Sequence, residues 1–262
     1  MKMGANGRVA AVTGGARGIG RRTAELLAER GFRLAIFDLH EPAATVKAIE
    51  ARGGEAMIFT GDATEETQVE LFTQRVFDLY GRADVLVNNA GISLISAAEE
   101  TTASDYRRVL EVNLVAPFLL AKAFGVRMLE ARSGSIVNVA SVAGLVGVSD
   151  RAAYNASKHG LVGLTRTLAA EWGGRGVRVN AVCPGWVKTE MDEADQAGGS
   201  YTDADITGRV PMARFASPGD VARAIAFLAD DAESGFVNGH TLTVDGGWTA
   251  DGSWESVRMR KR

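Results

Sequence analysis

The chain has 262 residues, of which 46% are hydrophobic and 23% are charged, so it is long enough to bury a sizeable apolar core. Its formal net charge of −3 argues against binding to a phosphate backbone, and nucleic acid is not expected as a partner. The single cysteine, Cys183, cannot form an internal disulfide, and its apolar neighbours predict a buried, unreactive thiol.

The beginning of the chain bears on where the protein resides. Residues 1–8 are polar and contain no apolar core of the kind found in secretion signals. No apolar stretch long enough to span a bilayer is expected elsewhere in the sequence. We therefore expect a cytoplasmic protein that has no membrane partner.

Short aliphatic and β-branched runs alternate along the chain with longer segments of helical periodicity. The runs predict strands at 9–13, 34–37, 56–59, 85–87, 136–139, 177–182 and 241–244, and the segments predict helices at 20–30, 65–80, 104–130 and 152–172. Three of the helices are expected to end at Gly31, Gly81 and Gly173, because glycine commonly stops a helix.

The predicted strands are continuously apolar rather than alternating, which is typical of strands covered on both faces. Parallel strands joined by right-handed helical crossovers give this arrangement. The pattern therefore predicts an α/β fold of Rossmann type, a doubly wound seven-stranded parallel sheet with helices on both faces. No repeat or Pro/Ser-rich linker divides the sequence, so residues 1–262 are expected to form a single domain.

A glycine-rich turn, TGGARGIG at 13–20, follows the first predicted strand and opens the first predicted helix. A dinucleotide pyrophosphate needs close backbone approach and free N–H groups at such a place. A glycine run alone is equally compatible with a flexible turn. The spacing here, however, resembles the TGxxxGIG pattern of the short-chain dehydrogenase/reductase family. The cofactor-binding residues predicted in this turn are Gly14, Arg17, Gly18, Ile19 and Gly20.

Asp38 ends the second predicted strand, where a carboxylate can accept hydrogen bonds from the adenosine ribose and would repel a 2′-phosphate. This favours NAD over NADP as the cofactor. Two other interpretations stay open: Asp38 caps the helix that follows, or Arg17 in the glycine turn attracts a phosphate.

Two further strand ends carry the same resemblance. Asp62 and Ala63 follow the third strand and resemble the family's adenine contact, and the NNAG motif at 88–91 follows the fourth, with Asn89 and Gly91 as predicted cofactor contacts. Open α/β sheets bind ligands at the carboxyl ends of their strands, so several strand ends indicate one site.

Tyr154 and Lys158 stand four residues apart in a predicted helix and therefore share one face of it. A helical tyrosine is commonly a packing residue, but Ser141 closes the fifth predicted strand and is expected at the same edge of the sheet. A free phenol has a pKa of about 10, so it needs nearby positive charge, such as that of Lys158, to act as a base. We predict that Tyr154 is a general acid and base and that Ser141 holds the substrate oxygen.

The family resemblance extends from about residue 7 to residue 247 and implies further roles. It implies that Lys158 and Tyr154 contact the nicotinamide half of the cofactor, and that Asn113 anchors a water relay to Lys158. An amide satisfied within its own helical region is the alternative for Asn113. The resemblance also places four residues after the sixth strand against the nicotinamide: Pro184, Gly185, Val187 and Thr189.

Other catalytic chemistries lack a motif. No serine nucleophile is linked to His40, His159 or His240, and no cluster of metal ligands is visible in the sequence. Residues 189–215 are the expected position of a substrate lid, hereafter the lid segment, with Gly198 and Gly199 supplying mobility. Residues 249–262 are expected to form a C-terminal tail.

The sequence thus predicts an NAD-dependent oxidoreductase that transfers hydride between nicotinamide and a secondary alcohol or carbonyl compound, with a polyol or sugar favoured. Trp186 and Met191 are candidates for the pocket wall. Two alternatives remain: a catalytically silent NAD sensor or scaffold, and a reductase of 3-oxoacyl or other carbonyl substrates. The resemblance implies a homotetramer, or a dimer, and the direction of the reaction stays open.

Overall fold

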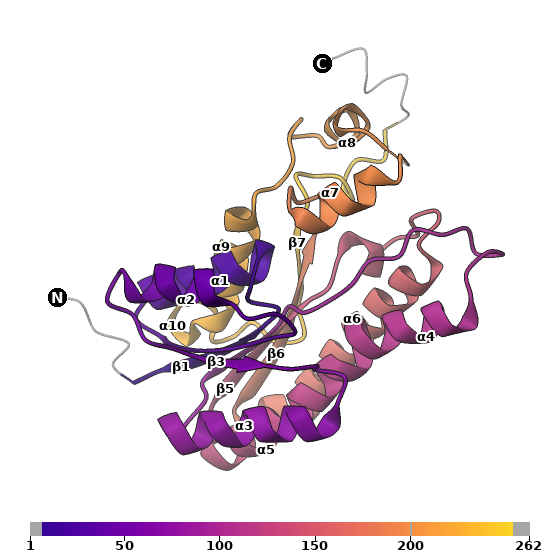
Figure 1. The fold of residues 1–262 in the computed structure, drawn as a ribbon. Helices are drawn as coiled ribbons and strands as arrows, with labels where there is room; N and C mark the ends of the chain where they lie inside the picture. Colours follow the sequence, from indigo (N-terminus) through magenta and orange to yellow (C-terminus); the bar gives the residue numbers. More distant parts are fainter. Residues whose placement is uncertain (1–6, 200, 254–262) are drawn as a thin grey trace.

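The computed structural model describes residues 7–199 and 201–253, and their centre is a parallel sheet with the strand order β3-β2-β1-β4-β5-β6-β7 (Figure 1). The strands are β1 Val9–Thr13, β2 Arg33–Asp38, β3 Ala56–Thr60, β4 Val85–Asn88, β5 Gly134–Val139, β6 Val177–Pro184 and β7 Thr241–Val244. The predicted seven-stranded parallel sheet is therefore confirmed. The end of the predicted tail, residues 254–262, lies outside the described residues.

Helices cover both faces of the sheet, as Figure 1 shows. They are α1 Gly18–Glu29, α2 Ala43–Glu50, α3 Glu66–Tyr80, α4 Ala103–Leu110, α5 Ala116–Ala131, α6 Ala152–Trp172, α7 Glu190–Ala197, α8 Asp203–Arg209, α9 Pro218–Ala229 and α10 Asp231–Ser234. The core of one face comes from α3, α5 and α6, and that of the other from α1, α2 and α9. The lid segment carries α7 and α8, which lie beyond the carboxyl end of the sheet.

The alternation of side chains along each strand divides the core into two layers. In β1, Val9 and Ala11 pack into the layer of α3, α5 and α6, whereas Ala10 and Val12 pack into the layer of α1, α2 and α9. Successive strand residues point to opposite faces, so a strand buried on both must be apolar at every position. This explains the continuous apolar runs in the sequence.

The predicted helix at 104–130 is not one regular helix. A π-helical turn, η1 at Glu111–Val115, separates α4 from α5, and π turns commonly occur at functional sites. The predicted end of the helix at Gly173 is confirmed, since Gly173 is the C-cap of α6 and opens a 3₁₀ turn at Gly173–Arg175. The chain reverses only at Gly176, whose φ is 89° and where an added Cβ would lie 2.1 Å from the carbonyl oxygen of Arg132.

We expected no stretch that could span a bilayer, but one helical run is long and apolar enough to do so, judged by length and composition alone. The combined helical run Ala103–Ala131 contains an 18-residue window with a mean hydropathy of 1.7. The apolar side chains of this run have an identifiable role in the fold, since Leu120, Phe124 and Met128 are buried in the core layer shared with α3 and α6.

The aromatic cluster under α3 provides a test of the core. The ring of Phe72 lies 4.9 Å from that of Phe37 and 5.6 Å from those of Phe59 and Phe124, measured between centroids, and its side chain is fully buried. Phe72→Ala is expected to lower the free energy of unfolding by about 3–5 kcal/mol in urea titrations. Its exposed neighbour is the matched control, and Leu71→Ala should change that free energy by only about 0.5 kcal/mol. Equal losses would contradict this account of the core.

Candidate active site

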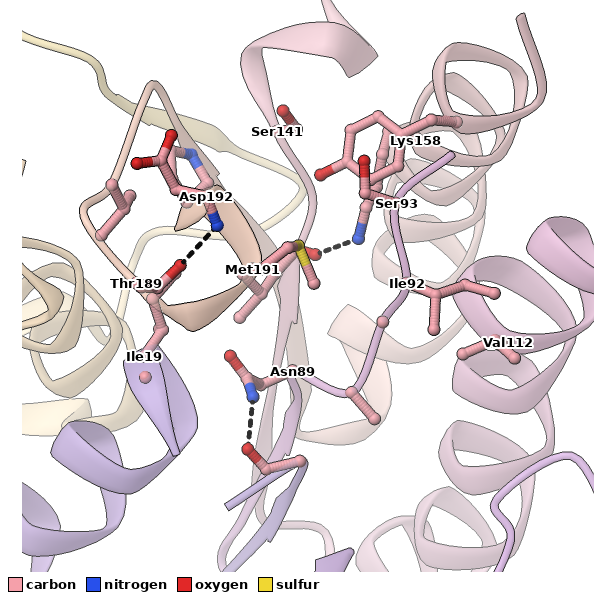
Figure 2. Close-up of a pocket in the computed structure, with 18 of the residues that line it drawn as sticks. Ile19, Asn89, Ile92, Ser93, Val112, Ser141, Lys158, Thr189, Met191 and Asp192 are labelled. Atoms are coloured by element: carbon pink, nitrogen blue, oxygen red, sulfur yellow. Dashed lines mark hydrogen bonds between the residues drawn. The ribbon is translucent and has the colours of Figure 1, made fainter. Parts of the chain in front are cut away.

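A cavity of about 650 Å³ opens at the carboxyl ends of the strands, beside the boundary between β1 and β4. The strand order reverses its direction of growth there, which is where open α/β sheets bind ligands. In Figure 2, Ser141, Lys158 and Ser93 lie on one side of this space, and Ile19 and Thr189 lie on the other. The cavity thus joins the cofactor and catalytic motifs predicted from the sequence.

The glycine turn between β1 and α1 is built for close backbone approach. Gly14 has a φ of 66°, and a Cβ there would lie 2.8 Å from the Cα of Ala90. Among the described residues, no side chain caps the first turn of α1, and Gly18 and Ile19 of that turn line the cavity, which is an arrangement that favours a bound anion. These features fit a dinucleotide pyrophosphate. Gly20 does not line the cavity, and its role is packing, because a Cβ would lie 2.0 Å from the carbonyl oxygen of Gly14.

Asn89 joins the ends of β1 and β4. Its side-chain amide donates to the carbonyl oxygens of Thr13 and Gly14, both at 3.0 Å. In return, the hydroxyl of Thr13 accepts bonds from the backbone N–H groups of Asn89 and Ala90, both at 3.1 Å. Asn89 therefore fixes the shape of the glycine turn, while Gly91 lies beyond it in the cavity wall.

Two carboxylates line the predicted adenosine end of the cavity. Asp38 accepts bonds from the backbone N–H of Ala16 at 2.8 Å and of His40 at 2.9 Å, one on each carboxylate oxygen. Asp62 likewise accepts from the backbone and hydroxyl of Thr64. These bonds hold both carboxylates in place, and each oxygen keeps further acceptor capacity for a bound ligand. Ala63 and Arg17 line the same end.

The three predicted catalytic side chains meet in the cavity wall. Ser141 stands just beyond the end of β5, and its hydroxyl accepts a bond from the N–H of Ala143 at 3.1 Å. Tyr154 and Lys158 come from α6, and the ammonium of Lys158 lies 5.6 Å from the centre of the Tyr154 ring. Lys158 also donates to the carbonyl oxygen of Val139 at 2.9 Å, the bond drawn in Figure 2.

Burial has the largest effect on the pKa values of Tyr154 and Lys158. It raises the pKa of Tyr154, whereas hydrogen bonding to Ser141 and the positive charge of Arg151 act in the opposite direction. It lowers the pKa of Lys158 to about 8. The sequence analysis expected Lys158 to supply the positive charge that ionises Tyr154. Arg151 adds a second positive charge near Tyr154, while Lys158, with a pKa of about 8, still holds its proton at neutral pH.

Asn113 lies in the π-helical turn, fully buried and outside the cavity lining. Its side-chain oxygen accepts from the backbone N–H of Ile92, and its amide donates to the carbonyl oxygen of Ile92, both at 2.9 Å. The amide also lies 3.2 Å from the hydroxyl of Ser157. These partners lie in other segments, so the amide is not satisfied within its own helical region. Asn113 holds the loop after β4 against α6.

The segment after β6 closes the side of the cavity. Pro184, Gly185, Val187 and Thr189 all line it, as do Trp186 and Met191, which the sequence suggested as wall residues. The hydroxyl of Thr189 caps α7 by accepting from the N–H of Asp192 at 3.4 Å (Figure 2). The predicted nicotinamide contacts therefore lie in one continuous stretch of the wall.

Sequence reasoning missed several polar residues of the cavity: Ser93, Arg151, Asp192, Asp195 and Tyr201. Arg151 stands three residues before Tyr154 at the start of the same helix, and that position was the available signal. Nothing local to Asp195 indicated that it would meet Arg151, because the two are 44 residues apart in the sequence.

A cavity at the carboxyl edge of the sheet that joins the glycine turn to Tyr154, the predicted acid–base residue, fits a pyridine-nucleotide-dependent oxidoreductase. A family model described as enoyl-(acyl carrier protein) reductase matches residues 14–249. The chain belongs to the short-chain dehydrogenase/reductase family.

Named relatives cover almost the whole chain. It is 42% identical over 246 residues to D-threitol dehydrogenase of Mycolicibacterium smegmatis, covering 93% of this chain and 94% of the relative. It is 39% identical to 3-oxoacyl-[acyl-carrier-protein] reductase of Synechocystis sp., covering 92% and 96%. A crystal structure from Beutenbergia cavernae, assigned as an NAD(P)-dependent gluconate 5-dehydrogenase with NADP at low occupancy, is 41% identical with a TM-score of 0.89, covering 96% and 100%.

The buried ammonium of Lys158 predicts a pH-dependent stability. Its pKa is about 8 in the folded protein against an ordinary value of 10.5, so the unfolded chain binds more protons between these values. The free energy of unfolding contributed by Lys158 should therefore rise by about 1–3 kcal/mol between pH 8 and 10.5. Urea titrations of the wild type and Lys158→Met measure this difference, with Lys122→Met as the control for an exposed ammonium. A difference independent of pH would refute the burial argument.

Proposed function

We propose that this protein catalyses reversible NAD-dependent hydride transfer between a secondary alcohol and the corresponding carbonyl compound. The observation that carries the proposal is the meeting of Ser141, Tyr154 and Lys158 in one cavity with the glycine turn. An intact acid–base group argues against a catalytically silent sensor or scaffold of the same fold.

Each catalytic side chain has a defined task in this proposal. Tyr154 takes the hydroxyl proton of the alcohol during oxidation and returns it to the oxygen of the carbonyl during reduction. Ser141 holds that oxygen by a hydrogen bond and stabilises the charge that develops on it. Lys158, bonded to Val139, lies beneath Tyr154 and orients the phenol. Bound NAD supplies the hydride acceptor in oxidation and, as NADH, the hydride donor in reduction.

NAD is the proposed cofactor because Asp38 holds a fixed carboxylate at the predicted adenosine end of the cavity, and a carboxylate there would repel a 2′-phosphate. Arg17 lines the same end of the cavity and favours a phosphate. The carboxylate has the stronger support, since two backbone N–H groups hold it in place.

The proposed substrate is a small polyol or sugar, in keeping with the relative named D-threitol dehydrogenase. Reduction of a 3-oxoacyl thioester is the second candidate, which the relative named 3-oxoacyl-[acyl-carrier-protein] reductase favours. An absorbance assay of NADH with polyols, sugars and acetoacetyl-CoA separates the two.

We propose further that the protein works in the cytoplasm as a homotetramer. The support for self-association is the outer surface of α5, where Phe118 and Val126 keep 43% and 53% of their area exposed. The lid segment is proposed to close over substrate, since α7 and α8 lie beyond the carboxyl end of the sheet.

Removal of the phenolic hydroxyl tests the central residue. Tyr154→Phe is expected to lower kcat/KM for alcohol oxidation about 10²- to 10⁴-fold, because the proton loses its acceptor. Fluorescence titration should show unchanged NADH binding. Tyr106→Phe is the matched control, since Tyr106 lies outside the cavity lining and should keep full activity. Retained turnover in Tyr154→Phe would remove this residue from the mechanism.

Removal of one charge tests the cofactor. The wild type is expected to have a higher kcat/KM with NAD than with NADP, and Asp38→Asn should raise the ratio of NADP to NAD efficiency about tenfold or more. The exposed Glu41→Gln is the matched control for loss of a nearby carboxylate. A wild type that prefers NADP would overturn the proposal for Asp38.

A further inference from the structure

Three side chains form a closed ring of hydrogen bonds in the wall of the cavity. The guanidinium of Arg151 donates to the hydroxyl of Ser93 at 2.7 Å and to a carboxylate oxygen of Asp195 at 3.0 Å. The hydroxyl of Ser93 donates to that same oxygen of Asp195 at 3.0 Å. These residues come from the loop after β4, the entry to α6 and helix α7, and all three line the cavity.

Backbone contacts join the loop that carries Ser93 to the segment that carries Arg151. The N–H of Ser96 donates to the carbonyl oxygen of Asp150 at 2.8 Å, and Ser96 and Arg151 form a parallel β-bridge. Only 13% of the Arg151 side chain and 17% of the Asp195 side chain are exposed, so water screens this pair far less than a surface ion pair. The wall is therefore a preorganised polar surface.

The ring of bonds also lies beside the proposed acid–base residue. The guanidinium carbon of Arg151 is 6.0 Å from the centre of the Tyr154 ring. Ser93 and Asp195 have no role in the proposed proton transfer, and Arg151 contributes only its positive charge to it. Figure 2 shows Ser93 on the same side of the space as Ser141 and Lys158. A substrate with its reacting oxygen at Tyr154 would bring its remaining groups close to this wall.

Resting on the proposed function, we propose that Ser93, Arg151 and Asp195 form a hydroxyl subsite, which binds a second hydroxyl group of a neutral polyhydroxy substrate. Arg151 is its specificity-determining residue. A hydroxyl group can accept a bond from Arg151 and donate one to Asp195, so it satisfies both charged groups at once. A hydrocarbon group at this place would leave Arg151 and Asp195 without a polar partner from the substrate. Sites built to bind a hydroxyl group strongly discriminate against analogues that lack it.

The charges around the hydroxyl subsite disfavour an anionic substrate. The positive charge of Arg151 is already balanced by Asp195, so a carboxylate would have to displace that side chain or lie against it. A second carboxylate, Asp192, lines the same cavity, is 6% exposed and accepts a bond from the hydroxyl of Tyr201 at 3.0 Å. The subsite therefore selects a diol or polyol over a hydroxy acid.

A matched substrate series tests the subsite: butan-2-ol has one hydroxyl, butane-2,3-diol has two, and 3-hydroxybutanoate has a hydroxyl and a carboxylate. The wild type should oxidise the diol with a kcat/KM about 10- to 100-fold above that of butan-2-ol. Arg151→Met should lower kcat/KM for both alcohols, because Tyr154 loses a nearby positive charge. It should lower the value for the diol about tenfold further, through a higher KM, and NAD binding should be retained. Arg151→Lys should restore part of the advantage of the diol.

Asp195→Asn makes the opposite test, because it leaves the charge of Arg151 unbalanced. This variant should gain efficiency with 3-hydroxybutanoate relative to the diol by about tenfold or more. Arg52→Met, which breaks an exposed ion pair with Glu29, is the control and should leave all substrate ratios unchanged. Equal losses on every substrate in Arg151→Met would overturn the proposal, because a residue that only supports the fold or Tyr154 acts on all substrates alike.

The proposed function and the subsite fail in different ways. If the wild type oxidises no alcohol, the proposed function fails, and the subsite is then judged by calorimetric binding of erythritol to the NAD-loaded protein. Arg151→Met should weaken that binding at least about tenfold. Absent binding by the wild type, or equal binding by both proteins, would overturn the subsite. If alcohols are oxidised but the diol has no advantage, only the subsite fails.

Discussion

The bonds between Asn89 and the end of β1 are the constraint on which the site depends. Two parallel strands whose chains leave in opposite directions must separate at their carboxyl ends, and the crevice between them receives the ligand. Asn89 fixes the distance between the two strand ends by donating hydrogen bonds to the carbonyl oxygens of Thr13 and Gly14. These bonds tie the glycine turn to the loop after β4. Gly14 and Gly20 have no Cβ, which allows the backbone segments to approach each other closely here.

The proposed acid–base group depends on the same architecture, and burial shifts the pKa values of its members. The carboxyl edge brings Ser141 from β5 and Tyr154 from α6 to one wall, and the surrounding core removes water from the phenol and from Lys158. Burial disfavours the charged forms of both groups, although Lys158, with a pKa of about 8, keeps its proton at neutral pH. A phenol held neutral is suited to give its proton to a carbonyl, whereas its use as a base requires positive charge nearby, which Arg151 contributes.

Much of the fold could be predicted because its signals are local. A strand buried on both faces needs an unbroken apolar run, so the strands were recognisable within one or two residues of their ends, and the glycine turn was recognisable where the first of them ends. Local periodicity could not show the π-helical turn at Glu111–Val115, because one extra residue per turn hardly changes the apolar pattern.

The amino-acid sequence by itself determined the doubly wound sheet, the residues offered to a dinucleotide and the pairing of Tyr154 with Lys158, because spacing of four places both on one helical face. Only the tertiary structure decided which side chains surround these residues. Asn113 meets Ile92 across 21 residues of chain, and Arg151 meets Asp195 across 44. Such contacts depend on how separate elements pack and where their side chains then point. For this reason the cofactor end of the cavity could be predicted from the sequence, whereas the wall facing the substrate could not.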